Sequence, residues 1–97
     1  IIMPDVKHVG GFGSLIGVCR LAETYGTIVS PHNPSGPVST AASLHAAALS
    51  KQVTSVEIPF LADRSSMALS HLIEGSYYRI PDTPGWGIAA DRPLLSV

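Results

Sequence analysis

The sequence predicts an α/β fold in which parallel strands alternate with crossover helices. Strand and helix signals alternate over residues 1–60, and glycine and proline stand where helices should end and begin. The connections are also long enough to cross between parallel strands, and such crossovers are nearly always right-handed. We therefore expect three parallel strands with two crossover helices in residues 1–60, followed by a tail in residues 61–97.

The first strand–helix unit covers residues 1–26. Residues 1–6 are a short apolar run that predicts a strand. After a glycine pair, apolar side chains recur at helical spacing, and Gly26 stands where a helix C-cap would. The apolar positions of this helix are Leu15, Val18, Ala22 and Tyr25.

The second unit and the third strand follow directly. Residues 27–30, TIVS, are rich in β-branched side chains and predict a strand, and the loop PHNPSGP ends at Pro37, which suits the first turn of a helix. That helix is predicted over residues 38–50, and residues 53–60, VTSVEIPF, predict the third strand. The expected apolar side of this helix consists of Val38, Ala41, Ala42, Ala48 and Leu49. Beyond residue 60 the chain is irregular and rich in Pro and Gly, with at most a short helix and one extended segment.

Composition limits the classes of function. The 97 residues carry a net charge of −1, and their six Lys and Arg are scattered rather than clustered, which excludes an electrostatic surface for nucleic acid or an anionic membrane. No apolar run approaches the roughly 18 residues of a membrane span. Hydrophobic residues make up 45% and charged residues 13%, which is apolar for so small a protein and indicates part of a larger one. The single cysteine, Cys19, is expected to be buried, and a cytoplasmic location is expected.

Three proton-handling residues fall at the predicted strand ends. Asp5, His32 and Glu57 each stand at or near the C-terminal end of a strand, and these ends share one face of a parallel α/β fold. Each also has a structural alternative: Asp5 as the cap of a turn, and His32 as an ordinary loop histidine. Glu57 is harder to explain structurally, because it interrupts an apolar strand and should point to a barrel interior or a site.

Two other features are interpreted as structural. His45 falls on the apolar side of the second helix, where a packing role is expected. Gly11, Gly13 and Gly17 follow a strand and open a helix, which is one property of a dinucleotide-binding turn. Their spacing is G-x-G-x-x-x-G, however, and the next strand ends in SPHN rather than in an acid that would hold a ribose hydroxyl. The glycines are therefore interpreted as a tight turn that keeps the floor of the site free of side chains.

Several ordered motifs together resemble a known enzyme family. PDVKHVGG is followed by PHN, GPVSTAASLHAAA, VEIPF and a tail that contains RIPDTPGWGI. This order, over essentially the whole chain, resembles the last third of a mandelate racemase type member of the enolase superfamily. Within that superfamily the closest likeness is to acid-sugar dehydratases such as those acting on galactonate. In the tail, Trp86 stands where the family commonly has Leu.

The resemblance implies a fold and an incomplete chain. It implies the last three βα units of a TIM-type (β/α) barrel in residues 1–60. Residues 61–97 would form a C-terminal tail that packs back toward a capping domain absent from this sequence. An eight-stranded barrel typically needs about 250 residues, so 97 residues cannot close one. The isolated fragment is accordingly expected to be inactive.

Residue roles are implied in the same way. In the family an Asp at the end of the sixth barrel strand bonds a His at the end of the seventh, and these positions correspond to Asp5 and His32. Glu57 corresponds to a Glu of the eighth strand that contacts the substrate carboxylate or the developing enediolate. Asn33, which follows the histidine in the PHN motif, is the predicted substrate-binding residue. No acid here is assigned to metal, because the metal ligands of the family come from the third to fifth strands.

The implied activity is Mg²⁺-dependent removal of the proton alpha to a carboxylate, most directly in the dehydration of an acid sugar. His32 would serve as general acid or base, and Asp5 would fix its tautomer. Glu57, if burial kept it protonated, would donate a hydrogen bond to the enediolate. The expected partners are a small acid sugar or hydroxy acid, the rest of the barrel, the capping domain and further copies of the protein.

Two alternatives stay open. One is a racemase, epimerase or cycloisomerase of the same superfamily; in a racemase, His32 would face one side of the substrate and a Lys from earlier in the chain the other. A noncatalytic α/β packing module predicts instead that Asp5 and His32 point apart. The relative position of these two side chains separates the catalytic from the noncatalytic alternative.

Overall fold

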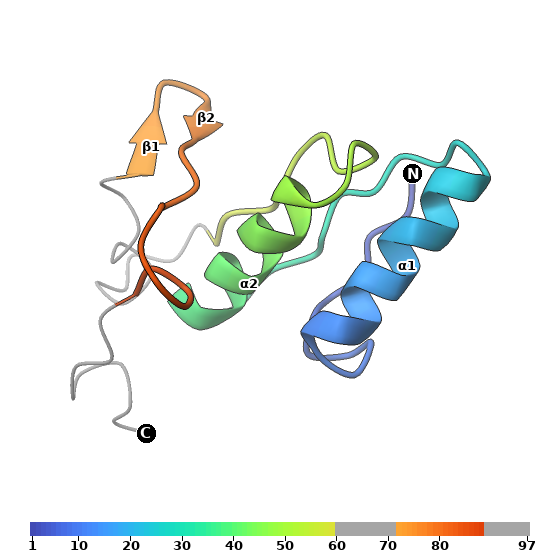
Figure 1. Cartoon of the computed structure of the whole chain (residues 1–97), viewed down its shortest axis with the longest axis horizontal. Coiled ribbons are helices and arrows are strands. Elements are labelled where there is room, and N and C mark those ends of the chain that lie inside the picture. Colours follow the sequence, from blue (N-terminus) through green and yellow to red (C-terminus); the bar gives the residue numbers. More distant parts are fainter. Residues whose placement is uncertain (60–71, 89–97) are drawn as a thin grey trace.

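The computed structural model describes residues 1–59 and 72–88, in which two helices and a two-stranded antiparallel sheet are present. The elements are α1 (Phe12–Thr24), α2 (Pro37–Ala48), β1 (Ile73–Glu74) and β2 (Tyr77–Tyr78). Helix α2 lies between α1 and the β1–β2 hairpin (Figure 1). Phe60 of the predicted third strand and residues 61–71 and 89–97 of the predicted tail lie outside the described residues. Neither helix is long and apolar enough to cross a membrane.

Three extended segments run parallel, but they pair through single residues. Val29 forms one parallel bridge with Ile2 and another with Val53, so the second segment is central. The structure therefore does not confirm three full strands, although it gives the predicted neighbours and direction at these positions. Among the described residues, the first and third segments each pair only with the second segment, on one side. This limits the length of regular pairing.

Backbone hydrogen bonds extend this pairing to the C-terminal ends of the segments. The His32 N–H donates to the Pro4 carbonyl at 3.0 Å, and the Glu57 N–H donates to the Pro31 carbonyl at 3.3 Å. Proline accepts such bonds but has no N–H to donate, so a proline in each segment interrupts a continuous ladder. The two bonds place the backbones of the candidate site residues side by side.

Helix α1 ends as the sequence predicts. Gly26 takes a φ of +62°, and its N–H donates to the Glu23 carbonyl at 3.2 Å. The Thr27 N–H donates to the Ala22 carbonyl at 2.9 Å. This pair of bonds is the Schellman arrangement, which satisfies carbonyls left free at a helix end and favours glycine at the left-handed position.

Helix α2 begins at the predicted proline, but its predicted apolar side is partly wrong. Val38 and Leu49 are 54% and 66% exposed. The helix instead buries small residues around most of its circumference. Because most of its residues are Ala, Ser or Thr, hydropathy distinguishes its faces poorly, while small side chains permit close packing on both sides. Its buried residues are Pro37, Ser39, Thr40, Ala41, Ala42, Ser43, Leu44 and Ala46.

The core consists of two apolar clusters on opposite sides of α2. The larger lies between the helices and the extended segments and contains the buried Cys19, as predicted; its buried members are Val6, Leu15, Cys19, Ala22, Val29, Ala42 and Ala46. The smaller joins α2 to the C-terminal residues through Ala41, Leu44 and Leu72. One side of helix α2 thus packs against α1 and the extended segments, and the other side packs against Leu72.

The hairpin is a feature that the sequence interpretation missed. Strands β1 and β2 pair antiparallel, with Ile73 opposite Tyr78 and Glu74 opposite Tyr77. An ion pair between Glu74 Oε1 and Arg79 Nε at 2.9 Å spans the hairpin, but both side chains are largely exposed, so it contributes little stability. The signal in the sequence was the Gly-Ser pair between two short runs of strand-forming residues.

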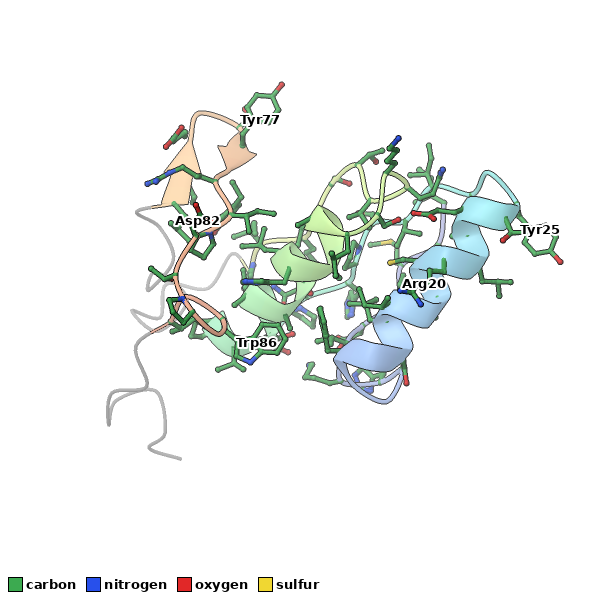
Figure 2. The ribbon with its side chains drawn as sticks, viewed as in Figure 1. Arg20, Tyr25, Tyr77, Asp82 and Trp86 are labelled. Carbon is green, nitrogen blue, oxygen red and sulfur yellow. The ribbon has the colours of Figure 1, made fainter. Side chains whose placement is uncertain are left out.

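Trp86 attaches the C-terminal residues to both helices. Its ring lies edge-to-face against Phe12 of α1, with centroids 5.0 Å apart, and against His45 of α2, with centroids 5.3 Å apart (Figure 2). The predicted packing role of His45 is confirmed by this contact. Gly87 beside it has a φ of +69°, and a Cβ there would lie 2.3 Å from Pro81 Cγ, so the turn admits glycine alone without rearrangement.

Candidate active site

Asp5, His32 and Glu57 meet at the C-terminal ends of the three extended segments. His32 Nδ1 lies 3.1 Å from Asp5 Oδ2, and His32 Nε2 lies 3.8 Å from Glu57 Oε2. Because an ionised carboxylate only accepts hydrogen bonds, the proton of this contact belongs to Nδ1. Nε2 is then the ring atom that can exchange a proton with a ligand. The His32 side chain is 42% exposed, so a ligand can reach it.

Asp5 is the buried member of this cluster. Its side chain is only 4% exposed, and its Oδ1 accepts the Lys7 main-chain N–H at 2.8 Å. Burial alone would raise the pKa of Asp5. The hydrogen bonds from the Lys7 N–H and from His32, with the nearby charges of Lys7 and His8, outweigh it and hold the pKa below the ordinary value of 3.8. Asp5 therefore both caps its own turn and contacts His32.

The lowered pKa of Asp5 predicts a pH-dependent contribution to stability. The contribution is complete above the pKa of the unfolded chain and is lost as pH falls through the lower pKa of the folded state. We expect Asp5→Asn to reduce the free energy of unfolding by about 2 kcal/mol at pH 7, the scale of a hydrogen bond to a charged group. The difference from the native protein should shrink below about pH 4.

Urea unfolding at pH 7 and pH 3 measures this difference. Asp82→Asn is the matched control, because Asp82 is exposed on the C-terminal turn and the same substitution there should leave stability within about 0.5 kcal/mol. A loss in Asp5→Asn that is equally large at both pH values would contradict the assignment.

Asn33 holds Glu57 in place and is itself bonded to Thr40. The Asn33 N–H donates to Glu57 Oε2 at 2.7 Å, and Asn33 Nδ2 donates to Thr40 Oγ1 at 2.7 Å and to the Glu57 carbonyl at 3.1 Å. Thr40 Oγ1 in turn donates to the Gly36 carbonyl at 3.2 Å. Thr40 Oγ1 and the Glu57 carbonyl, which both accept from Asn33 Nδ2, fix the orientation of the Asn33 amide. Thr40, which the sequence interpretation passed over, thus connects α2 to Asn33, and Asn33 bonds Glu57 of the third segment.

Two sequence expectations concern Asn33 and Glu57. Asn33 is fully buried and its amide contacts protein groups, so a direct contact with substrate stays a prediction that the geometry does not favour. The Glu57 side chain is 39% exposed among the described residues, and its expected hydrogen bond to the enediolate stays a prediction. The positioning of Glu57 by Asn33 could not be anticipated from spacing alone.

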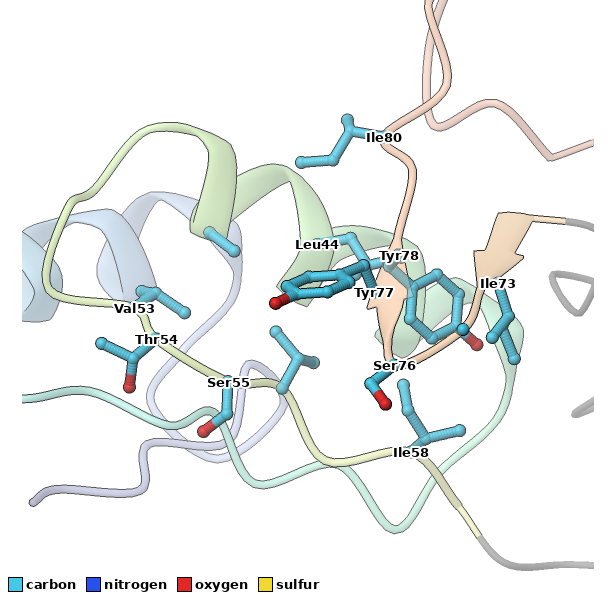
Figure 3. Close-up of a pocket in the computed structure, with 13 residues that line it drawn as sticks. Leu44, Val53, Thr54, Ser55, Ile58, Ile73, Ser76, Tyr77, Tyr78 and Ile80 are labelled. Carbon is cyan, nitrogen blue, oxygen red and sulfur yellow. The ribbon is translucent and has the colours of Figure 1, made fainter.

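A serine pair and a separate pocket lie on the elements next to the cluster. Ser30 and Ser55, two residues before His32 and Glu57, are hydrogen-bonded at 2.9 Å. A separate pocket of about 470 Å³ lies between α2, the third segment and the hairpin, with Leu44, Ile58 and Tyr78 among its lining residues (Figure 3). None of the three clustered residues lines it.

The chain does not supply a metal centre in its described part. Among residues 1–59 and 72–88, no three His, Cys, Asp or Glu side chains are arranged to hold a metal ion. The acids at the site are instead engaged with His32, Lys7 and Asn33. The residues in this described part therefore do not fit a metal ion by themselves.

The fold and the polar cluster define an α/β protein with a candidate site at the C-terminal ends of parallel segments. The chain belongs to the enolase C-terminal domain-like family, whose model matches residues 1–94. Domains of this family have a TIM-barrel-type α/β fold. The family resemblance drawn from the motifs is thus confirmed, and the arrangement of the extended segments agrees with an α/β fold of this kind.

Curated relatives agree with this family. The chain is 31% identical to D-galactonate dehydratases of Ralstonia pickettii (strain 12J) and Ralstonia nicotianae (strain ATCC BAA-1114 / GMI1000), and 30% identical to that of Xanthomonas oryzae pv. oryzae (strain PXO99A). Each match covers 98% of this chain and 27% of the relative. The chain therefore spans about a quarter of the length of these enzymes. No solved structure matches the chain.

Proposed function

We propose that this chain is part of an enolase-superfamily lyase that removes water from an acid sugar. The observation that carries the proposal is one imidazole placed between two carboxylates, with Nδ1 at 3.1 Å from Asp5 and Nε2 at 3.8 Å from Glu57. The noncatalytic alternative expected Asp5 and His32 to point apart, whereas the two side chains are within hydrogen-bond distance of each other. The name D-galactonate dehydratase of the relatives supports the reaction class.

His32 is the proposed proton carrier. Dehydration removes the proton alpha to the carboxylate and releases the beta hydroxyl as water, which leaves an enol that becomes an α-keto acid. With Nδ1 bonded to Asp5, Nε2 accepts the alpha proton, donates a proton to the leaving hydroxyl, or does both in turn. Asp5 keeps the ring in this tautomer and stabilises the imidazolium form, since its carboxylate lies within hydrogen-bond distance.

Glu57 is the proposed contact for the reacting end of the substrate. Its Oε2 is fixed by the Asn33 N–H, and its partly exposed carboxyl group lies near His32 Nε2. A group held in this way meets the substrate without first being reoriented. In this scheme Asn33 acts by positioning Glu57.

The rest of the site belongs to polypeptide outside this chain. We propose that residues 1–60 complete a (β/α) barrel and that residues 61–97 pack toward a capping domain. Ile1, Met3 and Ile28 are large apolar residues exposed along the first two segments, which is expected of a surface that other strands cover. The Mg²⁺ that the family implies would take its ligands from that part, where it would stabilise charge on the substrate carboxylate. Association of several copies and a cytoplasmic location stay predictions.

Turnover of acid sugars by the intact protein tests the proposal. We expect an α-keto acid to form from at least one sugar of a library that includes D-galactonate, in the presence of Mg²⁺. Absence of turnover with every acid sugar counts against dehydration. Exchange of the alpha proton for deuterium in D₂O, without formation of an α-keto acid, would instead indicate a racemase or an epimerase.

A further inference from the structure

Lys7 connects the two loops that carry the candidate site. Its ammonium group bonds the Ser35 hydroxyl, which links the loop after the first extended segment to the loop after the second. The same ammonium lies 3.6 Å from Asp5 Oδ2. One cation thus contacts a residue in each loop, and the proposed mechanism gives it no role.

Lys7 also holds the Asp5 carboxylate at both of its oxygens. The Lys7 main-chain N–H bonds Oδ1 at 2.8 Å, and its ammonium approaches Oδ2, the oxygen that His32 Nδ1 contacts at 3.1 Å. Ammonium and imidazole therefore share one oxygen of a buried acid. This fixes the plane of the carboxylate, and hence the direction from which it holds the imidazole, before a ligand arrives.

The other charged groups around Asp5 do not duplicate this contact. His8 Nε2 lies 3.9 Å from Asp5 Oδ2 on a largely exposed side chain, and Glu57 faces the opposite edge of the imidazole. Among the described residues that face Asp5, Lys7 is the one that also bonds the loop carrying His32 and Asn33.

We propose that Lys7 is a positioning residue that fastens the Asp5 loop to the His32 loop and orients the Asp5 carboxylate toward His32. The inference rests on the proposed function only in treating this cluster as catalytic. In the sequence, Lys7 stands between Asp5 and the glycine pair, and none of the motifs gave it a role. Its physical basis is the strength of hydrogen bonds that involve a charged donor.

Lys7→Met tests the inference, because it keeps an unbranched side chain and removes the ammonium. We expect the main-chain amides of His32 and Asn33 to exchange with deuterium about tenfold faster, the change that corresponds to about 1.4 kcal/mol. The Asp5 carboxyl, followed by NMR with ¹³C-labelled aspartate, should titrate at higher pH because a neighbouring cation has been removed. Lys7→Arg should restore both properties toward native.

Two further variants make the test specific. Ser35→Ala keeps the cation and removes its partner, so it should reproduce the faster exchange. Lys51→Met, at an exposed lysine in the turn after α2, should leave exchange and titration unchanged. Native exchange in both Lys7→Met and Ser35→Ala, or an unmoved Asp5 titration in Lys7→Met, overturns the proposal. Neither readout needs a substrate, so failure here is distinct from an absence of turnover, which would overturn the proposed function alone.

Discussion

His32→Asn is expected to lower kcat of the intact enzyme by about 10²–10⁴-fold while the fold is retained. The imidazole is the group that can both take and return a proton between Asp5 and Glu57, and an amide at its place cannot do so. The loss should appear in steady-state rates of α-keto acid formation. Circular dichroism and unfolding of the variant should stay close to native, because the ring is only partly buried.

His8→Asn is the matched control for this substitution. His8 Nε2 lies 3.9 Å from the same Asp5 oxygen that His32 contacts at 3.1 Å, but its side chain is 77% exposed. We expect its kcat to remain within about twofold of native, as for surface substitutions away from the reacting atoms. Full activity of His32→Asn, or an equal loss in the two variants, would refute the assigned role of His32.

Asn33→Ala is expected to lower the free energy of unfolding by about 2–4 kcal/mol, measured by urea unfolding. The Asn33 side chain is fully buried, and its amide donates to Thr40 Oγ1 and to the Glu57 carbonyl. Removing it leaves the buried Thr40 hydroxyl and the partly buried Glu57 carbonyl without this donor, and opens a cavity at the start of α2. Turnover should fall as well, because the backbone that carries Glu57 loses a hydrogen bond.

Ser39→Ala provides the contrast for Asn33. Ser39 Oγ is also buried, but it has no hydrogen-bond partner within the described part of the chain. Replacing a buried hydroxyl that makes no such bond should be neutral or slightly stabilising, since the cost of burying it disappears. If the two alanine variants have the same stability, the amide contacts of Asn33 do not carry the energy assigned to them.

The parts of the fold that depend on local chemistry could be predicted from the sequence. Gly26 marks the end of α1 and Pro37 the start of α2, because each residue suits a backbone position irrespective of what packs against it. The convergence of Asp5, His32 and Glu57 could be predicted as well. It follows from the shared direction of parallel segments rather than from any distant contact.

The remaining features depend on contacts between distant parts of the chain. The buried side of α2 is set by what lies on each side of it, and a helix of small residues gives little hydropathic contrast. The prolines at positions 4 and 31 shorten the regular pairing that the apolar runs had predicted. The Asn33–Thr40 contact likewise joins a loop to a helix face, and no spacing rule identifies such a pair.

Trp86 gives the protein an intrinsic optical reporter. It is the single tryptophan of the sequence, and its indole rests on the first residue of α1, a few positions after the acid that holds the imidazole. Lifting the C-terminal turn from the helices would expose this ring to water and move its fluorescence emission to longer wavelength. Movement of residues 81–88 away from Phe12 and His45 would thus be visible in this chain without a dye.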